Sequence, residues 1–170
     1  MHLTKKIFGY IGIFSPLILF IISSLILYTK PVLYSYYLVG LVFNTILNMV
    51  LKETFKDPRP EEDIKVIEIA LHKGKRISSD VYGMPSAHAQ NMGFSTMFIY
   101  YATKSETWTT FYFIVSVITM LQRYVFKNHT IAQVIIGFAV GCSVGYMFYY
   151  FFEKKMMGKL AFKADDFGPL

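Results

Sequence analysis

The chain alternates between long apolar runs and short segments that hold nearly all of its charged residues. Three uncharged runs reach the roughly 20 residues that a helix needs to cross the hydrocarbon core of a bilayer. They are Ile7–Tyr28, Val32–Leu51 and Thr130–Phe152. Each is therefore expected to be a transmembrane helix.

Two shorter runs are also expected to span. Trp108–Phe126 holds a single charged residue, close to its end. The run 88–103 is the least apolar, because Gln90 and Asn91 lie in its first turn. The expected fold for residues 1–170 is one all-α domain, a polytopic transmembrane bundle of about five helices.

The segment Lys52–Met84 is the only sizeable polar stretch between the expected spans. Within it, Ile64, Ile67 and Leu71 follow the spacing of one helix face, with charged residues opposite them. A short helix lying on the membrane surface is therefore expected after the second span.

Composition agrees with an integral membrane protein. Hydrophobic residues make up 54% of the 170 residues, above the roughly 45–50% of ordinary soluble domains. The net charge of +6 suits loops that meet the anionic headgroups of membrane lipids, and no separate basic patch suits nucleic acid. The single cysteine, Cys142, excludes an internal disulfide. Nothing in the sequence indicates an oligomeric state.

Five basic residues are expected to meet at one membrane face. If the spans alternate in direction, the segments near residues 52, 82–88 and 123–129 all lie on the side of the N-terminus. The residues brought together are Lys52, Arg59, His88, Arg123 and His129. The spans contain no carboxylate, and loop carboxylates such as Asp57 and Asp80 are expected to pair locally. Basic groups this close to lipid usually pair or serve a substrate, which indicates an anionic ligand such as phosphate.

The residue types at this face suit a phosphoryl group. Pro85–His88 is typical of a turn into a helix, with Ser86 as the N-cap, and the free N–H groups of a helix start bind anions. Arg59 and Arg123 can each give a bidentate fork to phosphoryl oxygens, and Lys52 adds a point charge.

His129 and Gln133 are four residues apart on the last expected span, so they share a helix face. The Gln133 carbonyl can accept a hydrogen bond from one ring nitrogen and leave the other free to attack. Each site residue alone has an ordinary structural explanation, since basic residues at span ends typically snorkel to the interface. Only the co-location of all five basic residues favours a site.

Three motifs resemble those of the type 2 phosphatidic acid phosphatase superfamily, which read K-x6-R-P, P-S-G-H and S-R-x5-H-x3-D. The matching stretches run from Lys52 to Pro60, from Pro85 to His88 and from Arg123 to Gln133. The resemblance implies a helical-bundle phosphatase that needs no metal or other cofactor. It implies that His129 is the nucleophile and that His88 protonates the leaving group. It also implies that the phosphoryl oxygens are held by Lys52, Arg59, Ser86 and Arg123.

Three positions depart from the superfamily pattern. Ala87 replaces a glycine, Gln122 replaces a serine, and Gln133 replaces the aspartate that supports the nucleophile. The dolichyl diphosphate phosphatase branch resembles this chain more closely, because it carries Y-G-M-P-S-x-H-x-Q and H-T-x-x-Q-V, as in Tyr82–Gln90 and His129–Val134. That resemblance implies hydrolysis of a polyprenyl diphosphate to the monophosphate and phosphate through a phosphohistidine. It also implies a place in the endoplasmic reticulum membrane, with the site facing the lumen.

Two alternatives to this function stay open. One is a broader lipid phosphatase that acts on phosphatidic acid or other prenyl diphosphates, and the other is a catalytically silent lipid-binding membrane protein. Orientation is a separate question, because most Lys and Arg residues lie on the site face, which the positive-inside rule would place in the cytoplasm. When the motif residues are left out, the two faces carry nearly equal numbers of Lys and Arg residues. The lumenal orientation therefore rests on the resemblance.

Overall fold

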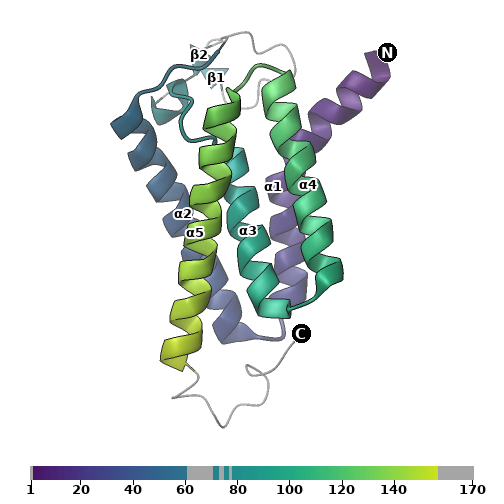
Figure 1. The fold of residues 1–170 in the computed structure, drawn as a ribbon, viewed down its shortest axis with the longest axis vertical. Helices are drawn as coiled ribbons and strands as arrows, with labels where there is room; N and C mark the ends of the chain where they lie inside the picture. Colours follow the sequence, from purple (N-terminus) through teal and green to yellow (C-terminus); the bar gives the residue numbers. More distant parts are fainter. Residues whose placement is uncertain (1, 61–70, 73–74, 77, 157–170) are drawn as a thin grey trace.

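Each apolar run of the sequence is a helix in the computed structural model, which describes residues 2–60, 71–72, 75–76 and 78–156. The described residues form five long α-helices, which confirms the expected all-helical bundle. The helices are α1 (His2–Leu27), α2 (Pro31–Phe55), α3 (Ala87–Thr103), α4 (Glu106–Val125) and α5 (Ile131–Met156). They run side by side along the long axis of the molecule, with α3 in the middle (Figure 1).

Local sequence signals account for several of the helix ends. Pro31 opens α2, where its fixed φ suits the first turn and its missing N–H has no helical partner to lose. Lys56 and Lys104 close α2 and α3 in the left-handed conformation, with φ of 48° and 51°. Ser105 caps α4, because its side chain accepts a hydrogen bond from the backbone N–H of Trp108.

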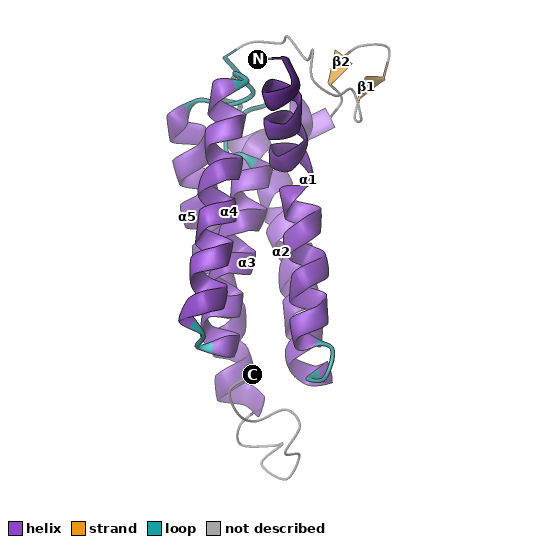
Figure 2. Ribbon diagram, turned by 90° about the vertical axis from the view of Figure 1, so that its right-hand side faces the viewer, coloured by secondary structure: helices purple, strands orange, loops and turns teal. Residues whose placement is uncertain are grey.

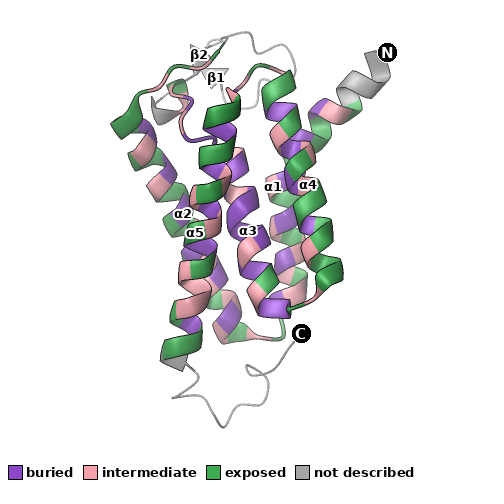
Figure 3. Cartoon of the chain, in the orientation of Figure 1, coloured by how far each residue is buried: buried purple, intermediate pink, exposed green. Residues whose placement is uncertain are grey.

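Three helical stretches are long and apolar enough to cross a membrane, namely Ile7–Leu27, Pro31–Phe55 and Ile131–Lys154. Helices α3 and α4 fall short of that measure. Most of α3 is buried, and α3 contacts all four other helices, so little of its surface would face lipid (Figure 3). A helix enclosed in this way can hold polar residues that a lipid-facing helix could not. We propose that α3 and α4 cross the membrane with the three helices they run beside.

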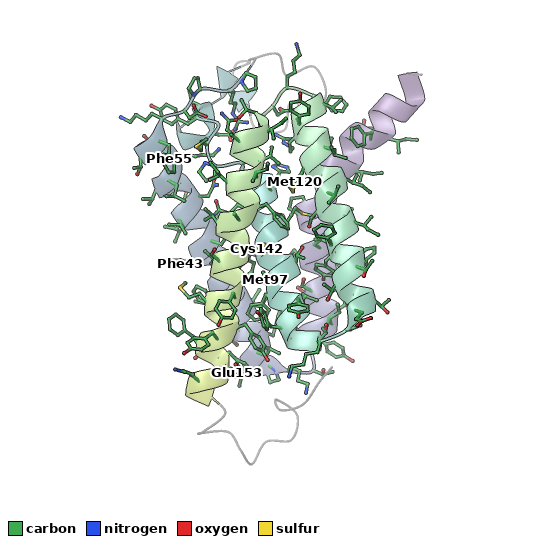
Figure 4. All side chains as sticks on the ribbon, viewed as in Figure 1. Phe43, Phe55, Met97, Met120, Cys142 and Glu153 are labelled. Carbon is green, nitrogen blue, oxygen red and sulfur yellow. The ribbon has the colours of Figure 1, made fainter. Side chains whose placement is uncertain are left out.

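Helices α3 and α5 pack closely along a stripe of glycines. A Cβ atom on Gly141 would lie 1.9 Å from the carbonyl oxygen of Gln90, so only glycine allows this approach. The stripe consists of Gly137, Gly141 and Gly145. Met97 of α3 and Cys142 of α5 mark the level of this interface in Figure 4.

A hydrogen-bond network explains the polar residues in the first turn of α3. The Gln90 Nε2 donates to the backbone oxygen and the Oδ1 of Asn44, at 2.8 and 2.9 Å, and its Oε1 accepts from Asn48 Nδ2 at 2.8 Å. Asn44 Nδ2 also donates to Asn91 Oδ1 at 2.8 Å, and Asn48 Nδ2 donates to the backbone oxygen of Pro85 at 3.1 Å. The network joins α2 to α3 and fixes the turn that leads into α3.

The segment between α2 and α3 differs from the expected surface helix. Leu71 lies in a two-residue strand, β1 (Leu71–His72), which pairs antiparallel with β2 (Lys75–Arg76). The helical spacing was therefore wrong for Leu71, since the glycine three positions later in the sequence disfavours a helix. Ile64 and Ile67 lie outside the described residues. A single 3₁₀ turn, η1 (Ser78–Val81), leads to the turn before α3.

The expected convergence of chain segments is found at one end of the bundle. The start of α1, the end of α2, the start of α3 and the α4–α5 connection all lie there, as the views in Figures 1 and 2 both show. The motif residues of three segments far apart in the sequence therefore meet at this end, beside the start of α1. The opposite end holds the α1–α2 and α3–α4 connections.

Candidate active site

His129 lies in the short connection before α5 and is 2% exposed. Its Nε2 is 2.9 Å from Nη1 of Arg59, and its Nδ1 is 3.1 Å from Oε1 of Gln133. A guanidinium can only donate, so Nε2 must accept and the ring proton must be on Nδ1. The histidine therefore donates from Nδ1 to Gln133, as the spacing of the two residues predicts, and directs the lone pair of Nε2 towards the cationic groups.

The connection that presents His129 is a tight turn. The backbone oxygen of Arg123 accepts hydrogen bonds from the N–H groups of Asn128 at 3.0 Å and His129 at 3.2 Å. Lys127 takes the left-handed conformation there, with φ of 54°. Arg59 Nη1 donates to the backbone oxygen of Asn128 at 3.0 Å, so the first motif also holds this turn. The backbone of the turn and the side chain of Arg59 together fix the position of the ring.

Lys52 and Arg59 already hold an anionic group. Asp80 Oδ1 is 3.0 Å from Lys52 Nζ and 2.7 Å from Arg59 Nη2. The side chains of the two cations are only 3% and 4% exposed, whereas that of Asp80 is 42% exposed. The loop carboxylate thus pairs locally, as expected, and an oxygen anion fits between two buried cations near Nε2 of His129.

Arg123 and His88 complete the set of basic residues. Arg123 is buried at the end of α4, and its charge acts on both His88 and His129. His88 is the second residue of α3, is partly buried, and lies against the backbone of Ile13 in α1. The structure therefore places His88 on the α1 side of the cationic group and His129 on the α5 side.

Ser86 is the N-cap residue of α3, but its side chain makes no capping bond. Its Oγ is buried and, within the part of the chain that the structure describes, has no hydrogen-bond partner. A buried hydroxyl without a partner is costly, and a ligand oxygen at this helix start would satisfy it. Its backbone N–H donates to the backbone oxygen of Gln133 at 3.0 Å, which ties the turn to α5.

The charge state of His129 follows from its surroundings. Burial, and then the positive charges of Arg59, Arg123 and Lys52, hold the pKa of His129 well below its usual value of 6.5. The hydrogen bond to Gln133 acts in the opposite direction but does not outweigh them. The ring is therefore neutral at physiological pH and keeps the lone pair that a nucleophile needs.

Two features of this region were not expected from the sequence. Asp57 accepts a 2.6 Å hydrogen bond from Gln133 Nε2, and its only signal in the sequence is its place two residues before Arg59 in the first motif. Gln122 is directed towards α1, where its side chain packs on Gly12. The amide of Gln122 is buried and has no hydrogen-bond partner among the described residues. The departure at Gln122 therefore affects the α1–α4 interface, while the departure at Gln133 directly affects the hydrogen bond to His129.

A mainly apolar cavity of about 620 Å³ adjoins His129. It lies where α4 and α5 meet, and its lining includes His129, Tyr124, Val125 and Ile131. Among the described residues, no group of three or more His, Cys, Asp or Glu side chains is placed to hold a metal ion. The site thus combines cationic groups with an apolar wall.

Several proteins of known name are similar to this chain. A dolichyldiphosphatase of Saccharomyces cerevisiae is 34% identical over 123 residues, which cover 65% of this chain and 48% of the relative. Dolichyldiphosphatase 1 of Dictyostelium discoideum is 28% identical over 139 residues, which cover 75% and 56%. A palmitoyl-protein thioesterase-dolichyl pyrophosphate phosphatase fusion of Schizosaccharomyces pombe is 29% identical over 164 residues, which cover 88% and 24%. The chain spans about half or less of the length of these relatives.

The fold is similar to that of a solved membrane enzyme. The structure of a transmembrane PAP2 type phosphatidylglycerolphosphate phosphatase from Bacillus subtilis aligns with a TM-score of 0.58 and 17% sequence identity, over 91% of this chain and 87% of that one. The profile of the PAP2 superfamily matches residues 33–157, which hold all three motifs. The matched region includes His129, its cationic neighbours and nearly all of the four helices α2 to α5, and the chain therefore belongs to the PAP2 superfamily.

Proposed function

We propose that the chain is a membrane phosphatase that hydrolyses a polyprenyl diphosphate to the monophosphate and phosphate. The observation that carries the proposal is the environment of His129, a neutral, oriented imidazole whose Nε2 faces buried cations. The names of the similar proteins in Saccharomyces and Dictyostelium support the diphosphate class of substrate. The apolar cavity beside the nucleophile suits a lipid substrate.

In the first step, Nε2 of His129 forms a bond to the terminal phosphorus and the bond from phosphorus to the bridging oxygen breaks. The arriving phosphoryl oxygens take over the cations that bind Asp80 in this structure, which also frees Nε2 from Arg59. Lys52, Arg59, Arg123 and the Oγ of Ser86 stabilise the charge on these oxygens. His88 donates a proton to the departing monophosphate.

In the second step, water attacks the phosphorus of the phosphohistidine and the N–P bond breaks. His88, which has lost its proton in the first step, can take one from this water, since the two steps are near mirror images of each other. Phosphate leaves, and His129 returns to its neutral form. The cycle uses only side chains of this chain and needs no cofactor.

Phosphate release in the presence of a metal chelator tests this function. The purified protein in detergent should release phosphate from a polyprenyl diphosphate at the same rate with and without the chelator. Phosphatidic acid, measured in parallel at matched detergent and pH, tests the broader lipid phosphatase. No release from either lipid would contradict the proposal and support the silent membrane protein. A rate that falls with chelator would contradict the cofactor-free mechanism.

We further propose that the chain resides in the endoplasmic reticulum membrane with the site facing the lumen. The short connections at the two ends of α4 offer matched positions for a test, because Lys104 and Lys127 are both exposed and both have positive φ. Each is replaced by cysteine in a Cys142→Ser background. In sealed microsomes a membrane-impermeant thiol reagent should label Lys104→Cys and spare Lys127→Cys. The reverse pattern would put the site in the cytoplasm, as the total count of basic residues suggests.

A further inference from the structure

The side-chain amide of Gln133 uses all of its hydrogen-bonding capacity. Its Nε2 donates to Asp57 Oδ2 at 2.6 Å and to the backbone oxygen of Pro58 at 2.8 Å. Its Oε1 accepts from the backbone N–H of Thr130 at 3.1 Å and from Nδ1 of His129 at 3.1 Å. Gln133 is fully buried, so water does not compete for these bonds.

These partners allow only one orientation of the amide. The carboxylate of Asp57 and the carbonyl of Pro58 can only accept, so the NH₂ group must face them and the oxygen must face His129. The short bond to a carboxylate draws electron density towards Oε1, because hydrogen bonds in a chain polarise one another. The amide therefore transmits the negative charge of Asp57 to the Nδ1–H of the nucleophile.

The turn before α3 holds this arrangement in place. Gly83 donates its backbone N–H to the backbone oxygen of Asp57 at 2.7 Å. A Cβ atom on Gly83 would lie 2.4 Å from Nε2 and 2.5 Å from Oε1 of Gln133, so the backbone of this glycine packs directly on the amide. Residues of the first and third motifs and the turn before α3 thus surround one amide group, although Asp57 and Gln133 are 76 positions apart.

We propose that Asp57 is the positioning carboxylate of the nucleophile and acts through Gln133. When Nε2 bonds to phosphorus, the imidazole ring gains a positive charge, and the polarised Gln133 oxygen stabilises that charge at Nδ1–H. The aspartate that the superfamily pattern places at position 133 is thus replaced by a glutamine together with a carboxylate from the first motif. This inference rests on the proposed role of His129, and it assigns a further functional residue to that site.

Substitution of Asp57 by asparagine tests the role of the charge. Asparagine keeps an oxygen that accepts from Gln133 and removes the negative charge. We expect kcat on a polyprenyl diphosphate to fall roughly 10- to 100-fold, by analogy with the loss of the partner that orients a metal-ligating histidine. The KM and the inhibition constant of inorganic phosphate should change little, because the cations that bind the phosphoryl group are intact. Glu53→Gln is the matched control, since it removes an exposed carboxylate four residues away.

The dependence of kcat/KM on pH gives a second readout. Protonation of His129 blocks attack, and its lowered pKa predicts activity that persists below pH 6.5 and falls only near that pKa. A carboxylate favours the imidazolium, so its removal lowers the pKa of His129 further. The acid limb of the pH profile of Asp57→Asn should therefore move to lower pH, while the acid limb of the profile of Glu53→Gln should stay in place. A purely structural role would lower the rate without moving the limb.

A variant that exchanges the carboxylate of Asp57 and the amide of Gln133 gives a sharper test. Gln133→Glu alone brings two carboxylates together and should be impaired. Asp57→Asn/Gln133→Glu restores one carboxylate and one amide in reverse order, and it should recover part of the kcat lost in Asp57→Asn. A double variant no better than Asp57→Asn, or a kcat of Asp57→Asn equal to that of Glu53→Gln, would overturn the role of Asp57. Turnover that survives in His129→Ala would instead overturn the proposed function itself.

Discussion

Substitution of His129 by alanine is expected to abolish turnover and covalent labelling. Removal of the nucleophile from a catalytic unit can lower kcat by on the order of 10⁶-fold, which would bring hydrolysis below detection. The wild type, incubated with a polyprenyl diphosphate labelled in its terminal phosphate and then quenched, should carry label that acid removes, as expected of a phosphohistidine. His129→Ala should carry none.

The histidine at the start of α1 provides the control for this experiment. His2→Ala changes the same residue type outside the three motifs, so it should keep both turnover and labelling. Vanadate, which mimics the five-coordinate phosphoryl centre, should inhibit the wild type and His2→Ala alike. Undiminished labelling in His129→Ala would show that another residue accepts the phosphoryl group.

Substitution of His88 by alanine is expected to have the second largest effect. Loss of a general acid typically lowers the rate about 10²- to 10⁴-fold, and that loss should appear with a polyprenyl diphosphate. A phosphorylated substrate with a strongly acidic leaving group needs no protonation, so its first step should be much less affected. With that substrate His88→Ala should accumulate labelled protein, because the same histidine assists the attack of water.

Rapid-quench measurements of labelled protein and released phosphate separate the two steps. The wild type should accumulate little labelled protein if water attacks the phosphohistidine as fast as it forms. An equal loss for good and poor leaving groups, with no accumulation, would contradict the acid role of His88. His88 would then only support the contact between α3 and α1.

The sequence determined the helices of this protein because local pattern suffices for them. An uncharged run such as Val32–Leu51 must satisfy its own backbone groups in lipid, and an α-helix does so within the segment. The bond between His129 and Gln133 was also predictable, because the four-residue spacing that makes side chains neighbours on a helix holds at the start of α5, although His129 itself precedes the helix. The same reasoning failed at Leu71, where a few apolar residues at helical spacing lie in a strand of a short hairpin.

The partners that join distant segments were decided only by the tertiary structure. The separation of Asp57 and Gln133 in the sequence does not predict that their side chains lie 2.6 Å apart. That contact depends on how α2, α5 and the turn before α3 pack. The same holds for Arg59, which reaches Nε2 of His129 from 70 positions away, and for Asp80 between its two cations. The motifs determined which residue types reach the membrane face. The packing of the bundle decided which of them form hydrogen bonds with each other and which bind the same anionic group.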